Sequence, residues 1–180
     1  MSTRDAAATR PRRALSAADV VDAALTLLQD FGMGDLSMRR VATQLGVQVS
    51  ALYWHVPNKQ TLLARVADRI VDGLATDAAA PASLAEAEER TQAALLSYRD
   101  GADVVLTALA LGLGGGALHT VFIAAAQAEG ATAAQAEAAL ARVLGATAMR
   151  QHRSQAQALG VEVGPDYLVH LHPATTRPAS

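Results

Sequence analysis

The chain has 180 residues, of which 51% are hydrophobic, and a formal net charge of −2. This length suffices for one sizeable hydrophobic core or two small ones. Aromatic residues make up only 3% of the chain, and a sequence rich in alanine and leucine favours packed helices over strands. Cysteine is absent, which excludes disulfides and thiolate-ligated zinc. We expect an all-α, cytoplasmic protein.

The first 15 residues carry Arg4, Arg10, Arg12 and Arg13, and no apolar run follows them. A secretory signal requires such a run, so none is predicted here. We expect residues 1–15 to form a disordered basic arm. Residues 1–75 hold nine Lys or Arg against seven Asp or Glu, whereas the remainder holds six against ten. This mild asymmetry favours a polyanion-facing N-terminal part.

A first helix is predicted to begin after Ser16 and to end at Gly32. Asp19 stands three residues after Ser16, the spacing of a capping box, and apolar residues then recur at helical intervals. This helix contributes one apolar face to a small core.

Residues 36–63 contain a helix-turn-helix pattern. Ser37 can cap a short helix that ends at Gly46, and a third helix spans about 48–54. Ala42 and Leu52 stand where such a unit needs a small residue at the helix contact and a core anchor. The pattern predicts a three-helix head.

The segment LGVQVSALYWHVPNKQTLL, residues 45–63, resembles the recognition helix and next-helix start of the tetracycline-repressor (TetR) family of bacterial transcription regulators. The run from Leu15 to about Leu74 follows that family's three-helix head. LLSYRDGADVVL and ARVLGATAMRQHRSQAQAL resemble segments of its ligand-binding body, though less closely. The resemblance implies a helix-turn-helix DNA-binding domain over residues 16–75.

The resemblance also implies which residues contact DNA. They are Arg39, Gln48, Val49, Ser50, Ala51, Tyr53, Trp54, His55 and Lys59. Lys59, Tyr53 and His55 suit phosphate contacts. Base edges suit Arg39, Gln48, Ser50, Val49 and Ala51, since an arginine can bind guanine and small apolar side chains can touch a thymine methyl.

Plainer interpretations of the same side chains remain open. Tyr53 and Trp54 can be packing aromatics, and Arg39 and Arg40 can be solvated charges on a helix surface. The arginines of the arm can follow a minor groove or belong to an untethered tail.

A fourth helix is predicted after Asn58, with apolar residues every three or four positions up to Leu74. Residues 76–82 read as a linker. The body, an effector-binding and dimerisation domain over residues 83–159, is then expected to contain four helices. Their predicted spans are 84–99, 101–111, 117–129 and 132–159. Asp100 and Asp103 are expected to be solvated residues at a helix end.

Residues 160–180 show no sustained period and are predicted to be an irregular tail. The family usually supplies a further C-terminal helix to its dimer interface, and this pattern does not predict one. We still expect a homodimer, but the sequence leaves its mode of assembly open.

The uncharged run over residues 104–128 is long enough to cross a bilayer. Four glycines, Gly112 and Gly114 to Gly116, interrupt it, so two buried helices are the favoured interpretation and no membrane is expected.

The resemblance implies a small-molecule pocket in the body. The positions that would bind a tetracycline–magnesium chelate hold Val105, Ala75, Ala87 and Ala108, so an apolar or amphipathic effector is expected instead. Effector-binding residues are not assigned. Polar side chains that could anchor an effector are Gln92, Tyr98, His119 and Gln127.

No catalytic, metal-binding or cofactor motif is evident, and we expect no enzyme. The sequence therefore predicts a ligand-responsive repressor that binds a double-stranded DNA operator and a small effector. The alternative is a truncated or degenerate relative that binds an effector or partner without productive DNA binding.

Overall fold

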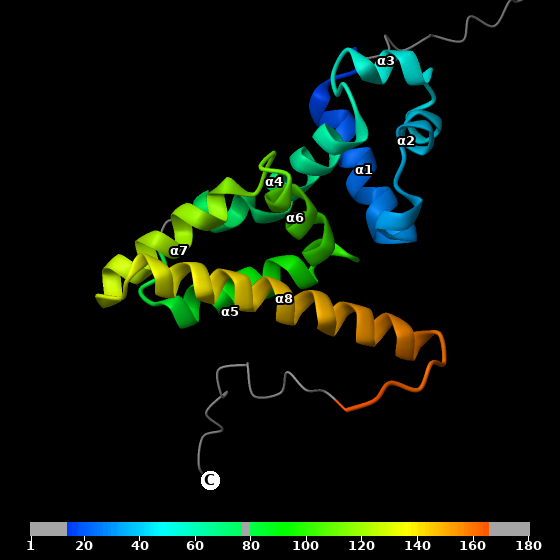
Figure 1. Ribbon diagram of the computed structural model, residues 1–180. Coiled ribbons are helices and arrows are strands. Elements are labelled where there is room, and N and C mark those ends of the chain that lie inside the picture. Colours follow the sequence, from blue (N-terminus) through cyan, green and yellow to red (C-terminus); the bar gives the residue numbers. More distant parts are fainter. Residues whose placement is uncertain (1–13, 77–79, 166–180) are drawn as a thin grey trace, which may run out of the picture.

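A computed structural model describes residues 14–76 and 80–165, and none of these residues lies in a β-strand. The helices form a small head and a larger body, with α4 running from one into the other (Figure 1). The predicted all-α architecture is thereby confirmed. Residues 1–13, with the arginines of the expected arm, and residues 166–180 lie outside the described parts.

The head consists of α1 (Ala17–Phe31), the short 3-10 helix η1 (Met33–Asp35), α2 (Met38–Leu45) and α3 (Val49–Tyr53). A full capping box starts α1, because the Ser16 hydroxyl accepts from the Asp19 N–H while the Asp19 carboxylate accepts from the Ser16 N–H. One face of α1 is buried against α2 and α4. The capped start and the stop at Gly32 match the predicted first helix.

Helix α4 (Lys59–Thr76) connects the head to the body. Its predicted apolar stripe is buried, with Leu62, Val66 and Val71 fully inaccessible to solvent. The helix packs against α1 in the head and against α5, α6 and α7 in the body. An ion pair between Arg69 Nη2 and Asp22 Oδ1, 2.7 Å apart, further ties α4 to α1. A displacement of α4 by the body would therefore be transmitted to the head.

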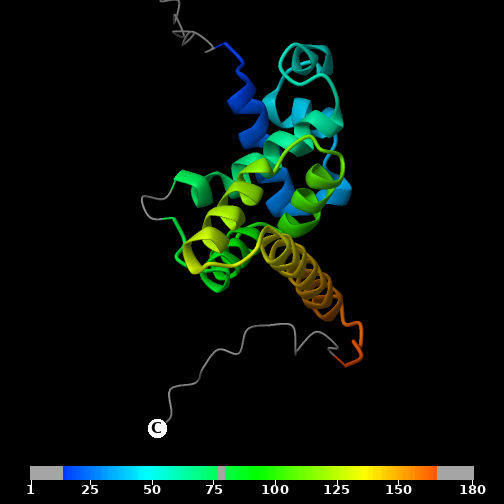
Figure 2. The ribbon, with the colours of Figure 1, turned by 60° about the vertical axis from the view of Figure 1, so that its left-hand side comes forward.

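The body consists of α5 (Leu84–Leu96), α6 (Gly101–Ala110), α7 (Gly116–Glu129) and α8 (Ala133–Ala158), and α8 extends along its lower edge (Figures 1 and 2). Ser83 and Thr132 cap α5 and α8 through N–H groups three residues on. Helix α5 ends three residues before the predicted Arg99, because a tight turn at residues 97–100 brings α6 back against it.

Two segments were predicted to be irregular. The linker begins after Thr76, and residues 77–79 lie outside the described parts. Residues 161–165 of the tail have no regular secondary structure. None of the described helices has the length and apolar character needed to cross a membrane. The uncharged run over residues 104–128 is divided between α6 and α7, as predicted.

The prediction for Asp100 is wrong. Its carboxylate is not a solvated cap: Oδ2 accepts a hydrogen bond from the Met33 N–H in the head at 2.7 Å, and Oδ1 accepts one from the Gln155 side chain on α8. Asp100 is the only non-glycine residue with a positive φ, 54°, among the described residues. The turn between α5 and α6 thus joins the head to α8. Its two hydrogen bonds link residues that are 67 and 55 positions apart in the chain, so local sequence patterns do not reveal them.

Candidate nucleic-acid interface

Helices α2 and α3 meet at a turn whose geometry depends on Gly46. This residue adopts φ 64° and ψ 33°, the left-handed conformation that glycine tolerates best. The Gly46 and Val47 N–H groups then donate to Thr43 O and Ala42 O at 3.1 and 3.0 Å. The Ala42 side chain is 1% exposed, so the small residue allows the two helices to approach. The turn points α3 outward from the head (Figure 1).

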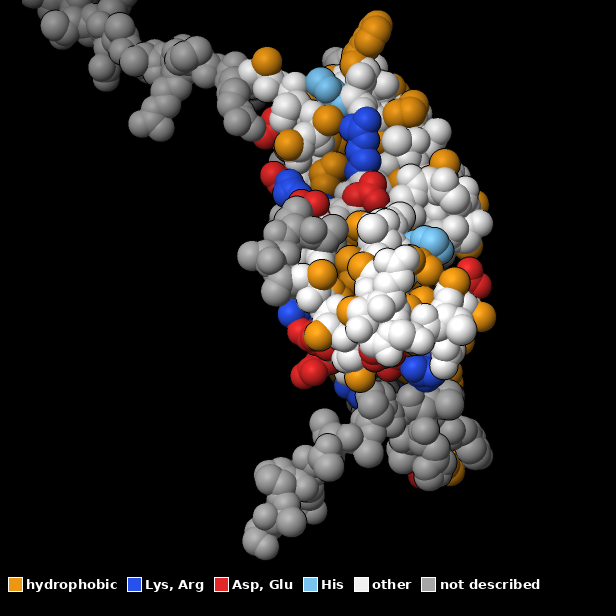
Figure 3. All heavy atoms as spheres, turned by 90° about the vertical axis from the view of Figure 1, so that its left-hand side faces the viewer, with side chains coloured by type: hydrophobic (Ala, Val, Ile, Leu, Met, Phe, Trp, Pro, Cys, Tyr) orange, Lys and Arg blue, Asp and Glu red, His pale blue; other side chains and the backbone are white. Residues whose placement is uncertain are grey.

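Buried residues anchor helix α3 to the head, whereas the aromatic side chains at its end are exposed. Leu52 and Val56 are fully buried, and both the His55 and Val56 N–H groups donate to Leu52 O. By contrast Tyr53 is 51% exposed and Trp54 is 89% exposed. A hydrophobic side chain projects from the head end of the molecule in Figure 3. An indole left in water by its own domain is unusual for a packing residue, because burial of an aromatic side chain is strongly favourable.

The small side chains of α3 are only partly available. Gln48 is the exposed N-cap of α3 and its side chain makes no capping hydrogen bond, and Ser50 is exposed. Val49 and Ala51 are half-buried, and Val49 packs partly against the core. The face that could meet base edges is therefore narrow and only weakly polar.

The two arginines of α2 differ in their contacts. The Arg40 guanidinium forms an ion pair with Asp35 and lies 4.4 Å from the centroid of the Phe31 ring. Arg39 is exposed, and its guanidinium has no hydrogen-bond or ion-pair partner in residues 14–76 and 80–165. Of these two arginines, Arg39 is the one whose guanidinium has no partner in the described parts of the chain.

The start of α4 supplies a second potential anion contact. The Asn58 side chain accepts from the Thr61 N–H at 2.8 Å and so caps the helix. Lys59 follows directly and is half-buried, as is His55. A lysine at the positive end of a helix dipole suits a phosphate group. Asn58 was not among the predicted contact residues, and its side chain serves as the predicted cap of α4.

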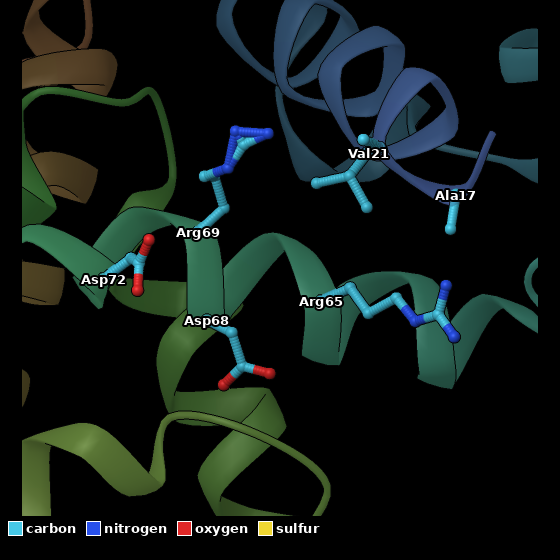
Figure 4. A pocket seen from close by; sticks show the side chains of 7 residues that line it. Ala17, Val21, Arg65, Asp68, Arg69 and Asp72 are labelled. Carbon is cyan, nitrogen blue, oxygen red and sulfur yellow. The ribbon is translucent and has the colours of Figure 1, made fainter.

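A shallow surface depression of about 320 Å³ lies elsewhere, between α1 and α4 (Figure 4). Arg65, Asp68, Arg69 and Asp72 of α4 face it together with small residues of α1. It is charged and lies at the joint of head and body, so it does not match the apolar effector site predicted for the body. Within the described ranges, no cluster of His, Asp or Glu is arranged to hold a metal ion.

Taken together, the capped α2, the glycine turn and the projecting α3 define a helix-turn-helix protein. Residues 20–66 match the family model described as bacterial regulatory proteins, tetR family. Over 99 residues the chain is 39% identical to the class D tetracycline repressor of Escherichia coli, a match that covers 51% of this chain but only 45% of that protein. The chain therefore aligns with less than half the length of this relative.

Solved structures extend the similarity to most of the chain. BioQ of Mycobacterium smegmatis superimposes with a TM-score of 0.70 and 38% identity, covering 81% of this chain and 89% of that one. The structure of BioQ bound to its double-stranded DNA operator gives a TM-score of 0.69 and 36% identity, covering 82% of this chain and 94% of that one. A TetR variant of Acinetobacter baumannii in complex with minocycline gives a TM-score of 0.63 and 29% identity, covering 82% of this chain and 88% of that one. The chain belongs to the TetR family of bacterial regulatory proteins.

Proposed function

We propose that this protein is a transcriptional repressor that binds a double-stranded DNA operator and releases it when a small apolar or amphipathic molecule binds the body. The observation that carries DNA binding is the exposure of Tyr53 and Trp54 at the end of a short helix whose Leu52 is buried in the head. The uncommitted guanidinium of Arg39 lies on the adjoining helix. The similarity to BioQ, which is 36% identical and has been solved with its double-stranded DNA operator, supports DNA binding.

The nine predicted contact residues divide by chemistry. Lys59, His55 and Tyr53 bind phosphates and position the head, and Trp54 packs against the sugar–phosphate backbone. Arg39, Gln48 and Ser50 read base edges. Because Val49 and Ala51 are apolar and half-buried, their contribution is limited to contact with thymine methyl groups.

The effector differs from a tetracycline–magnesium chelate. Val105 and Ala87 are fully buried and Ala108 is 1% exposed, so the positions that would supply polar ligands form part of an apolar core. Side chains without lone pairs cannot coordinate magnesium. A repressor needs an effector that favours the released form by about 1–3 kcal/mol over the DNA-bound form.

The operator-binding unit is a homodimer formed through the outward face of α8. Ala138, Ala141 and Met149 are exposed along that face, Met149 by 46%, and Gly145 is half-buried between them. Small side chains allow a second helix to approach closely. Two heads held one helical turn of DNA apart would read two half-sites.

The test is a mobility shift on duplex DNA from the region upstream of the protein's own gene. We expect the wild-type protein to retard this duplex. The double variant Tyr53→Ala with Lys59→Ala should bind it at least roughly tenfold more weakly, because it loses a phosphate contact and an aromatic contact. Circular dichroism should show little change, since neither side chain is in the core.

A matched control removes one cation and one exposed apolar side chain far from the head. Arg90→Ala with Val161→Ala changes α5 and the segment after α8, where Val161 is 54% exposed, and should bind as the wild type does. If the Tyr53 and Lys59 double variant retards the duplex as well as the wild type, the DNA-binding assignment is wrong. An intact monomer in sedimentation that retards no duplex would favour the degenerate relative.

A further inference from the structure

The buried polar side chains of the body lie along one contact. Among the described residues, those that are buried and polar are Glu88 and Thr91 on α5 and Thr147 and Gln151 on α8. Helices α5 and α8 pack against each other, and both also pack against α6 and α7. We refer to these four residues as the polar seam. A polar group in such a place requires a partner, because an unpaired buried group is destabilising.

The two ends of the polar seam have partners. Glu88 forms an ion pair with Arg142 of α8. The Gln151 side chain accepts from the Ala102 N–H at 3.1 Å and donates to Leu95 O at 3.2 Å and Tyr98 O at 2.8 Å. These contacts pair the start of α5 with the middle of α8, and the end of α5 with a later part of α8.

The centre of the polar seam has none. Thr91 and Thr147 are both 0% exposed, and their hydroxyl oxygens have no hydrogen-bond partner within residues 14–76 and 80–165. Thr91 lies between Glu88 and Leu95 on α5, and Thr147 lies between Arg142 and Gln151 on α8. The contacts on either side therefore place the two hydroxyls at the same level of the α5–α8 interface.

The surroundings define what could pair with these hydroxyls. Val105 of α6 and Leu118 and Phe122 of α7 are buried, on the helices that border α5 and α8. Glu88, which carries the one buried carboxylate among residues 14–76 and 80–165, is already paired with Arg142. A charged guest would lack a counter-charge and would bear a large desolvation penalty. A neutral, mostly apolar guest with one hydrogen-bonding group fits both features.

We propose that Thr91 and Thr147 anchor the effector, and that the effector is a neutral, largely apolar molecule carrying a hydroxyl or carbonyl group. This proposal depends on the proposed function in one respect, namely that the bound molecule acts as an effector. Because both hydroxyls are 0% exposed, binding requires α5 and α8 to move apart. The hydroxyls donate to, or accept from, its polar group, and the alanines and aliphatic side chains nearby contact its apolar part.

The first measurement asks whether the two hydroxyls lack partners in the folded protein. Valine has nearly the shape of threonine, so Thr91→Val with Thr147→Val removes only the hydroxyls. We expect a melting temperature that is unchanged or up to about 4 °C higher, because unpaired buried hydroxyls destabilise the fold. Thr120→Val, at an exposed position on α7, is the control. A clear fall in melting temperature beyond that control overturns the proposal.

The second measurement uses three probes of one shape, 2-naphthol, naphthalene and 2-naphthoate, with binding to the full-length protein followed by fluorescence. The wild type should bind 2-naphthol about five- to tenfold more tightly than naphthalene, a difference typical of one buried hydrogen bond, and 2-naphthoate more weakly than 2-naphthol. The valine double variant should bind 2-naphthol and naphthalene equally. Equal affinities in the wild type, preference for 2-naphthoate, or an unchanged preference in the variant overturn the proposal.

Neither measurement involves DNA. A protein that retards no duplex but shows the naphthol preference would refute the proposed function and keep this site. A protein that binds its duplex but shows no preference for 2-naphthol would support the proposed function and refute this site.

Discussion

Two adjacent arginines on α2 have different environments. Arg40 forms an ion pair with the Asp35 carboxylate and lies over the Phe31 ring. The guanidinium of Arg39 has no partner in the described parts of the chain. An arginine that is already paired has to break its contacts before it binds DNA, so the two should contribute unequally.

We expect Arg39→Ala to weaken binding of the upstream duplex by about 1–3 kcal/mol and to relax the preference for one base pair. Arg40→Ala should change the affinity for the duplex by less than about 0.5 kcal/mol, because the Arg40 guanidinium is already paired within the head. Fluorescence titration with the duplex and with single-base variants would measure both effects. Equal losses in the two variants would show that the intramolecular contacts of Arg40 do not persist on DNA.

Asp100 is a second residue whose role depends on distant partners. Its carboxylate contacts the Met33 N–H of the head and the Gln155 side chain of α8, and its backbone adopts a left-handed conformation. Hydrogen bonds to a partly buried carboxylate are stronger than those between neutral groups. The residue therefore stabilises the relative position of the head and the body.

Replacing Asp100 with alanine should lower the free energy of unfolding by about 2 kcal/mol, measured by urea denaturation. The matched control is Asp103→Ala, whose carboxylate contacts an exposed His152 at 2.6 Å and should contribute less than about 1 kcal/mol. A loss at Asp100 no larger than that at Asp103 would mean that the contact with the head adds little stability.

At the scale of elements, α4 is held by the loop between α6 and α7. A Cβ atom on Gly114 would lie 2.7 Å from Ala64 O, so the loop touches the backbone of α4 directly. One residue later, the Gly115 N–H donates to Asp68 Oδ1 of α4 at 2.7 Å. Movement of α6 and α7 would therefore displace α4, and Arg69 with Asp22 would carry the displacement into α1.

The variant Gly114→Ala should force α4 away from the loop and lower stability by roughly 1–3 kcal/mol, since the added methyl meets backbone that cannot rotate aside. It should also weaken duplex binding, because the head moves with α4. Gly116→Ala is the control: a Cβ there meets nothing within 4 Å. Chemical denaturation and the mobility shift would report the two effects. Equal behaviour of the two variants would exclude the loop as a connection between body and head.

At the scale of the whole molecule, a chain of net charge −2 must bind a polyanion through local rather than overall charge. Arg39 and Lys59 are placed beside α3, whereas Glu86, Glu88 and Glu89 lie on α5 in the body. Arg39 and Lys59 therefore supply favourable charge locally, at the α3 end of the molecule. Few cations there can release counterions from DNA.

We expect the logarithm of the affinity for the duplex to fall linearly with the logarithm of salt concentration. Lys59→Ala should reduce the magnitude of the slope by about 1 for each half-site, because one phosphate contact is lost. Titrations between low and moderate salt would measure it. An unchanged slope would place Lys59 away from the phosphates.

Features that depend on residues close in the chain could be predicted from the sequence. The starts of α1, α2, α5 and α8 follow from Ser16, Ser37, Ser83 and Thr132, because a capping side chain bonds an N–H three residues on. The turn at Gly46 and the inward position of Leu52 are local in the same sense. The helix order, the helix-turn-helix and the outward position of Tyr53 and Trp54 were accessible in this way.

Features that depend on contacts between distant residues were decided only by the tertiary structure. Asp100 pairs with Met33 and Gln155, and no periodicity links positions so far apart. Thr91 and Thr147 are unremarkable helix residues until the packing of α5 on α8 buries both hydroxyls without partners. Hydrogen-bond patterns along a helix span three or four residues, whereas burial and ion pairing depend on which helices meet. The sequence by itself therefore determined the helices and the exposed face of α3 that we propose for DNA, and the tertiary packing decided how head and body are joined.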